Sequence, residues 1–423
     1  MSAPAPARRT AAIALCGLGI ALVVTVALTT PWHPLPGPGL PAAPARDFTP
    51  AELARERAFA ADLRPPGYLG LAAALLSIVI LGLSPLGARL LGHVVGPARR
   101  WPLGVAAAAI VVTAVPRAAA LPFDAWTETV LRRYGLSTQR WAGWAVDQLK
   151  SFAVAAVTWT VALLLLHLLV RRMPRHWWAP AAAGSFLLVV AISFGYPLVV
   201  EPVFNSFTPM RAGPLRTELL RLARDDGVPV RKVLVADASR RTTALNAYVS
   251  GFGSTRRIVV YDTLLRSASP GEIKLIVAHE LGHAKRGDVL YGTLLGGLGV
   301  ATGVCALYLL TTSPRVLRRA GVSSVADPRA VALVLALVTV GTQLAGPVQT
   351  LVSRRIEARA DVHALDLTRD PRTFVRMQRA LAVRNLSDLR PNPIEYALWA
   401  THPTGPQRIA MARAWARGHG MPS

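Results

Sequence analysis

Cysteine and lysine are scarce in this chain of 423 residues, and acidic residues are few. The two cysteines, Cys16 and Cys305, both lie in long apolar runs, which excludes a disulfide framework and a cysteine-ligated metal site. Lysine occurs at four positions, so most of the 47 basic residues are arginine, and with 23 acidic residues the net charge is +24. In a soluble protein such an excess would suggest a nucleic-acid partner.

The arginines, however, flank apolar runs, as in residues 171–178 and 313–321. This placement is typical of side chains that anchor a protein at the membrane interface and contact anionic lipid headgroups. No nucleic-acid-binding module is evident, so the sequence predicts membrane lipid as a partner and no nucleic acid.

Apolar runs are abundant, since 52% of the residues are hydrophobic. Seven runs are close to the length that crosses a hydrocarbon core of roughly 30 Å. The first is longer than the apolar part of a usual signal peptide and six more follow it, so we expect a retained helix. A mainly α-helical, multi-pass protein of the cell membrane is therefore predicted. The runs cover approximately residues 11–30, 68–88, 102–121, 152–170, 178–200, 290–312 and 329–351.

The stretches between these runs are more polar. Residues 31–66 predict a proline-rich connector that leads into a short polar helix, and residues 117–150 predict amphipathic interfacial structure. After residue 200 a polar α+β module begins, with one soluble helix followed by short strands rich in β-branched residues. The helix is expected over residues 208–229, and the strands over residues 232–237, 246–253 and 256–262.

This alternation predicts a protease-like module that is split by the last two membrane spans. Its parts would be a membrane domain of five helices, a first module segment, a helical hairpin and a second module segment. The predicted boundaries are 1–200, 201–289, 290–351 and 352–423.

The motif His279-Glu280-Leu281-Gly282-His283 indicates metal chemistry. Ser269 as N-cap, Pro270 at the first helical position and Glu272 three residues after the cap predict a helix that contains it. On that helix, imidazoles four residues apart project from one face and can bind one zinc ion. The glutamate beside the first ligand can then take a proton from a water that the metal activates.

A catalytic zinc site needs a third protein ligand. In the segment RRIEARADVHALD (354–366), Glu357 is placed to ligate the metal, while Asp361 accepts a hydrogen bond from a ligand imidazole. Spacing alone leaves open an alternative in which both carboxylates pair with neighbouring arginines on a solvated helix. His363 is the rival third ligand.

At this point the chain resembles the CAAX prenyl protease 1 family of integral-membrane zinc endopeptidases. The matching segments are collinear over most of the chain, and together they are highly specific. Ala244 stands where eukaryotic members carry a histidine. The segments are YGLSTQRWAGWAVDQLKSF (134–152), EPVFNSFTPMRAGPLR (201–216), SRRTTALNAYVSGFGSTRRIVVYDTLL (239–265), HELGH (279–283), IEARAD (356–361) and THPTGPQRI (401–409).

The resemblance implies one zinc ion per chain, bound by His279, His283 and Glu357, with Glu280 as general base. It also implies seven transmembrane helices around a water-filled intramembrane chamber, with a small zincin-like α+β module at its wall. Asp361 matches the acidic residue behind the metal ligands.

Further site residues follow only from the resemblance. Asn246, Ala247 and Tyr248 match a strand that lies beside bound peptide, and His402 and Arg408 match residues close to the reacting carbonyl. On the residues alone, ordinary structural roles are favoured for Asn246, His402 and Arg408.

The predicted function is a zinc-dependent membrane endopeptidase that acts on peptides or membrane-associated proteins, in CAAX-type processing or in protein turnover. One alternative is an intramembrane site-2-type metalloprotease, which would need the zinc motif inside a span. Another is a polytopic transporter or scaffold that retains a metal site without catalysis. Basic loops place the protease module outside the cell, whereas the resemblance implies a module that faces the cytoplasm, which is the orientation we expect.

Overall fold

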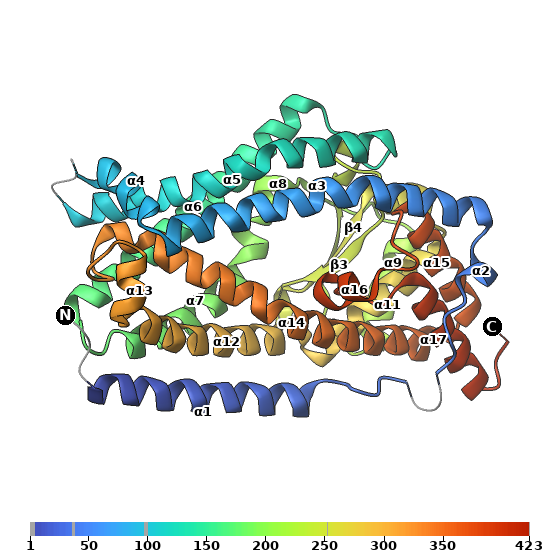
Figure 1. Ribbon diagram of the computed structural model, residues 1–423. Coiled ribbons are helices and arrows are strands. Elements are labelled where there is room, and N and C mark those ends of the chain that lie inside the picture. Colours follow the sequence, from blue (N-terminus) through green and yellow to red (C-terminus); the bar gives the residue numbers. More distant parts are fainter. Residues whose placement is uncertain (1–4, 36–38, 97–99, 252, 423) are drawn as a thin grey trace.

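The computed structural model describes residues 5–35, 39–96, 100–251 and 253–422. Seven helices in this part of the chain are long and apolar enough to cross a membrane, as predicted. Figure 1 shows that the axes of the long helices are roughly aligned. They extend between an end near α4 (Pro85–Val95) and α13 (Pro314–Arg319) and an end near a small sheet and the C-terminal helices. The seven are α1 (Ala5–Thr29), α3 (Pro50–Leu83), α5 (Trp101–Arg133), α6 (Trp141–Arg172), α7 (Trp178–Val199), α12 (Asp288–Thr311) and α14 (Val331–Thr368).

Several expected boundaries differ in the structure, and the seventh run continues to Thr368 as α14, the helix that also carries Glu357. The polar helix of the connector and the second apolar run form one helix, α3, which ends at Leu83 instead of continuing to residue 88. Ser84 lies outside the helix and its hydroxyl accepts the Leu86 N–H, so a new helix, α4, begins at Pro85. The expected interfacial segment 117–150 is largely the continuation of α5 and α6, joined by a short turn.

The sheet has the strand order β1-β2-β4-β3. The three predicted strands are present as β2 (Lys232–Ala236), β3 (Ala247–Ser250) and β4 (Arg257–Tyr261). β2 and β4 are parallel, and β3 is antiparallel to β4 at the edge of the sheet.

A strand that was not predicted, β1 (Phe207–Pro209), pairs with β2 in antiparallel orientation. It lies where the predicted helix 208–229 was expected to begin, so the prediction of helix was wrong for these first residues. The helix, α9 (Pro214–Asp225), begins only after Gly213, because Pro214 sets its first turn and the chain before it pairs with β2 instead.

One hydrophobic core contains residues from both sides of the α12–α14 hairpin. Leu264 and Leu281 are buried in it together with Phe374 and Trp415. The C-terminal residues come from α15 (Pro371–Arg384) and α17 (Gly405–Gly418), which pack on each other. Segments that are distant in sequence therefore form one packed unit at one end of the long helices (Figure 1).

Candidate metal centre

The helix that carries the zinc motif is α11 (Pro270–Arg286), and it begins as predicted. The Ser269 hydroxyl accepts the Glu272 N–H, while the Glu272 carboxylate accepts the Ser269 N–H. The apolar face of the helix is buried in the module core, with Ile273 and Leu281 at most 1% exposed. Gly287, at φ 68°, ends the helix in the left-handed conformation that favours glycine.

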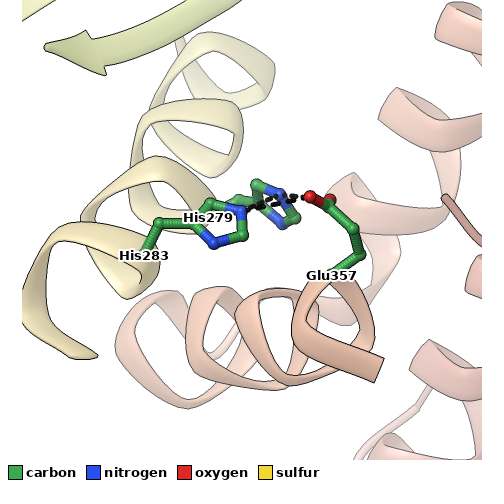
Figure 2. A group of neighbouring side chains, drawn as sticks. All are labelled: His279, His283 and Glu357. Carbon is green, nitrogen blue, oxygen red and sulfur yellow. Dashed lines mark hydrogen bonds and ion pairs between the residues drawn. The ribbon is translucent and has the colours of Figure 1, made fainter. Parts of the chain in front are cut away.

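His279, His283 and Glu357 lie together, and their side chains point toward one another from α11 and α14 (Figure 2). His279 Nε2 is 3.2 Å from His283 Nε2 and 3.2 Å from Glu357 Oε2, and His283 Nε2 is 3.5 Å from Glu357 Oε1. Ligand atoms about 2.0–2.1 Å from a tetrahedral zinc ion lie about 3.3 Å from one another. The three side chains therefore fit a zinc ion and leave a fourth position for a water molecule or substrate.

The positions of the two candidate third ligands favour Glu357 over His363. The rival, His363, points away from the cluster, and its Nε2 lies 2.9 Å from Asp226 Oδ2. Asp226 also accepts a hydrogen bond from Lys285 at 2.7 Å, so this buried carboxylate joins the end of α9 to α11 and α14.

Neither carboxylate of the segment makes the arginine pairs that the solvated-helix alternative requires. Arg354 donates to the carbonyls of Tyr396 and Ala400, and Arg359 bonds Asp288. Glu357 instead faces histidines, which leaves it available for a metal ion.

Asp361 lies behind His279 and is fully buried. Its Oδ1 is 2.8 Å from His279 Nδ1, and Arg408 holds the same carboxylate through Nη2 to Oδ1 and through Nε to Oδ2 at 2.7 Å. Burial lowers the pKa of His279, but the hydrogen bonds of Asp361 and Glu357 outweigh it and raise this pKa to about 10. Two carboxylates thus converge on one imidazole, an arrangement that favours a cation, either a proton or a metal ion, at this point.

Glu280 is half-buried beside the cluster and does not belong to the three ligating groups. Burial raises the pKa of Glu280, while the imidazoles of His279 and His283 lower it. The backbone of Val249 in β3 also interacts with this carboxylate and lowers its pKa. The edge strand therefore runs directly past the predicted general base.

The three residues expected to bind substrate lie at the start of that strand. Asn246 is exposed and its carbonyl accepts the Tyr261 N–H, while Ala247 is buried. The Tyr248 hydroxyl lies 3.4 Å from Glu201, a residue of α8 (Glu201–Phe204). Asn246 is thus open to a ligand, whereas the Tyr248 ring is directed towards α8.

Asn385 at the end of α15 was not predicted to be near the site. Its side chain accepts the Leu245 N–H at 3.0 Å and donates to the Leu245 carbonyl at 3.3 Å. It therefore fixes the backbone that enters β3. An asparagine at a helix end gives no sequence signal for a partner 140 residues away.

His402 reaches the cluster from the segment between α16 (Pro393–Trp399) and α17. Its Nε2 is 3.2 Å from Glu357 Oε2, and its side chain is 57% exposed. It is the most accessible imidazole at the centre, as a group that contacts substrate must be. Arg408, expected near the same reacting carbonyl, donates to both oxygens of Asp361, and its Nη2 also lies 3.4 Å from His279 Nδ1.

Gly282 lies between the two motif histidines where α11 packs closely on α14. A Cβ at this position would lie 3.0–3.1 Å from the His363 ring and Cβ. We expect Gly282→Ala to lower thermal stability and zinc affinity, because overpacking of about 1–3 kcal/mol exceeds the helix-propensity gain of alanine, about 1 kcal/mol.

Gly292→Ala in α12, where a Cβ would meet nothing within 4 Å, is the matched control and should be neutral or stabilising. The double variant Gly282→Ala/His363→Ala should recover zinc affinity because it restores the space. If Gly282→Ala unfolded at the same temperature and bound zinc as well as Gly292→Ala, the proposed tight approach would be wrong.

Two known protein families match this chain, one in its N-terminal half and one in its C-terminal half. The sequence profile of peptidase family M48 matches residues 209–416, and that of the CAAX prenyl protease N-terminal region, with five membrane helices, matches residues 70–206. An uncharacterized metalloprotease, YhfN, of Bacillus subtilis is 32% identical over 296 residues, or 69% of each chain. A CAAX prenyl protease 1 homolog of Arabidopsis thaliana is 28% identical over 296 residues, or 68% of each chain.

The fold is also similar to a solved one. The crystal structure of S. mikatae Ste24p superposes with a TM-score of 0.78 over 95% of this chain and 97% of that one, at 19% sequence identity. The arrangement of long helices, small sheet and zinc-motif helix is therefore a known architecture.

Proposed function

The chain belongs to peptidase family M48, and from that premise we propose that it is a zinc-dependent endopeptidase that cuts peptides or membrane-associated proteins. It is a membrane-embedded metalloprotease, and hence a hydrolase, as the sequence predicted. The observation that supports the zinc proposal is the approach of the His279 and His283 Nε2 atoms to each other, at 3.2 Å, and to the two oxygens of Glu357, at 3.2 and 3.5 Å.

The protein's own residues divide the chemistry between them. His279, His283 and Glu357 would hold the zinc ion, which would lower the pKa of a bound water molecule towards 7 and polarise the scissile carbonyl. Glu280 takes the proton of that water and later gives it to the leaving amine. Burial raises the pKa of Glu280 above the usual value of a carboxyl, which is the direction that favours return of the proton to the amine.

Substrate binding is proposed at β3. This strand lies at the edge of the described sheet, and the backbone of its residue Val249 lies beside the Glu280 carboxylate. An extended peptide can add to such an edge through backbone hydrogen bonds, beside Asn246, Ala247 and Tyr248. Recognition would then depend on the peptide backbone more than on its side chains.

The remaining site residues support the reaction in two ways. His402 is placed to stabilise the negative charge that develops on the carbonyl oxygen, since it is exposed and adjoins Glu357. Asp361 and Arg408 act behind the metal ligands, where they hold the His279 ring in the orientation that presents Nε2.

The alternatives fit the geometry less well. A site-2-type protease requires the motif within a membrane span, but α11 is a separate helix that ends at Arg286 before α12 begins. A transporter or scaffold with a metal site is disfavoured by the match to a peptidase family along the whole second half of the chain.

For the cellular setting, we propose the plasma membrane, with the protease module facing the cytoplasm and membrane lipid as the surrounding partner. Water would reach the zinc through an intramembrane chamber between the helices, as the resemblance implies. The proposed units are the membrane helices of 1–200, the module segments 201–289 and 352–423, and the hairpin 290–351.

A comparison of one prenylated peptide with its unprenylated twin tests the substrate class. We expect the zinc-loaded protein to cleave both, because β3 reads backbone, and to prefer the prenylated peptide, because its lipid partitions into the membrane beside the site. Equal cleavage rates for the two peptides would exclude CAAX-type processing as the function and would favour general peptide turnover. Cleavage of neither peptide by zinc-loaded protein would contradict the peptidase proposal.

A further inference from the structure

The second motif histidine has a carboxylate behind it that the motif does not include. His283 Nδ1 lies 2.8 Å from Oδ2 of Asp288, the first residue of α12. The left-handed Gly287 makes this contact possible, because it turns the chain so that the start of α12 faces the last turn of α11. The Asp288 side chain is only 11% exposed.

Asp288 is in turn held by an arginine. Arg359 Nη2 bonds Asp288 Oδ1, the oxygen that His283 leaves free. Arg359 lies two residues after the metal ligand Glu357 on α14, and its side chain is 24% exposed. The contact therefore joins the zinc helix, the start of the sixth span and the helix of the third ligand.

The same arrangement occurs twice at this centre. His279 is backed by Asp361, which Arg408 holds, and His283 is backed by Asp288, which Arg359 holds. In each case the aspartate faces Nδ1, and Nε2 points to the other ligands. An imidazole whose Nδ1–H donates to a carboxylate presents the lone pair of Nε2 to a metal ion.

We propose that Asp288 and Arg359 are positioning residues for the metal centre, which fix the His283 ring and connect it to the helix of Glu357. This inference rests on the proposed zinc site and goes beyond it. The competing structural explanation is that Asp288 serves only α12, as an acidic residue in the first turn that interacts with the helix dipole. That explanation gives no role to the His283 contact and predicts no effect on zinc.

Zinc affinity of the purified full-length protein, measured by competition with a chromophoric chelator, separates the two explanations. We expect Asp288→Ala to weaken zinc binding about 10–100-fold, the usual cost of losing such a partner. Asp288→Asn, which keeps the shape and removes the charge, should weaken it less. Arg359→Ala should weaken zinc binding as well, and Arg359→Lys should restore part of the loss.

Arg355→Ala is the matched control, because Arg355 lies one turn earlier on α14 and is exposed, so zinc binding should not change. Since Asp288 and Arg359 act through one contact, the double variant Asp288→Ala/Arg359→Ala should lose no more affinity than Asp288→Ala alone. Thermal unfolding of the metal-free variants shows whether a loss reflects misfolding.

Wild-type affinity in Asp288→Ala together with a lower unfolding temperature of the metal-free protein would assign Asp288 to helix capping and overturn the proposal. Additive losses in the double variant would overturn the link between Asp288 and Arg359. A wild-type protein that binds no zinc would instead contradict the proposed function, so the two failures are distinguishable.

Discussion

Glu280→Gln removes peptide cleavage while zinc binding remains: this is the expected result for a general base that does not ligate the metal. The amide has nearly the shape of the carboxylate, so the packing against β3 is kept, but it cannot accept the proton of the attacking water. General acid–base groups contribute about 10²–10⁴-fold, and we expect kcat to fall by that factor. Zinc content and peptide hydrolysis measured on the same preparation test it.

Glu218→Gln provides the control for this substitution, because it makes the same chemical change in α9, where Glu218 pairs with Lys274 at 3.1 Å. It should retain full activity. If Glu280→Gln cleaved peptide at the wild-type rate, another group would have to act as base and the mechanism would be wrong. If the Glu280→Gln variant lost its zinc, Glu280 would have to be counted among the metal ligands.

Local signals in the sequence predicted the parts of the site that depend on short spacings. The capping residues Ser269 and Glu272 start α11 as expected, because both of their hydrogen bonds form within one helical turn. The histidines His279 and His283 share a face because four residues make about one turn. The β-branched segments formed β2, β3 and β4 for the same local reason.

Contacts between distant segments could not be predicted in this way. Spacing left Glu357 and His363 as rival ligands, since both lie on one helix and either could face α11. The direction of each side chain is decided by tertiary packing: Asp226 attracts His363, and the zinc-motif histidines face Glu357. The Asp288–Arg359 contact likewise spans 71 residues and has no local signature.

The proline pair in α3 also shows that local sequence signals do not predict the effect of tertiary contacts. The connector with its polar helix was expected to end at residue 66 and the second span to begin at residue 68, yet one helix, α3, contains Pro65 and Pro66 and continues through them. Contacts with the C-terminal segment hold the helix on both sides: Arg64 bonds Asp388 and Glu395, and the Tyr68 ring packs 5.5 Å from Trp399. Tertiary contacts thus outweigh the local cost of proline in a helix.

Glu357→Ala should reduce bound zinc from about one ion per chain to background, because two histidines alone do not complete a catalytic zinc site. The glutamate also faces His402, so its loss removes both a metal ligand and the partner of the exposed imidazole. Metal content determined after equilibration with limiting zinc, together with peptide cleavage, should fall in parallel. Excess zinc should not restore cleavage to the wild-type rate.

His363→Ala is the decisive comparison for Glu357→Ala, since it alters the rival ligand on the same helix. Because His363 bonds Asp226 outside the cluster, this variant should keep its zinc and lose only the stability that the Asp226 contact provides. The reverse pattern, with zinc lost in His363→Ala and retained in Glu357→Ala, would move the third ligand by six residues and refute the geometry proposed for the metal centre. Zinc retained in both variants would show that neither residue ligates it.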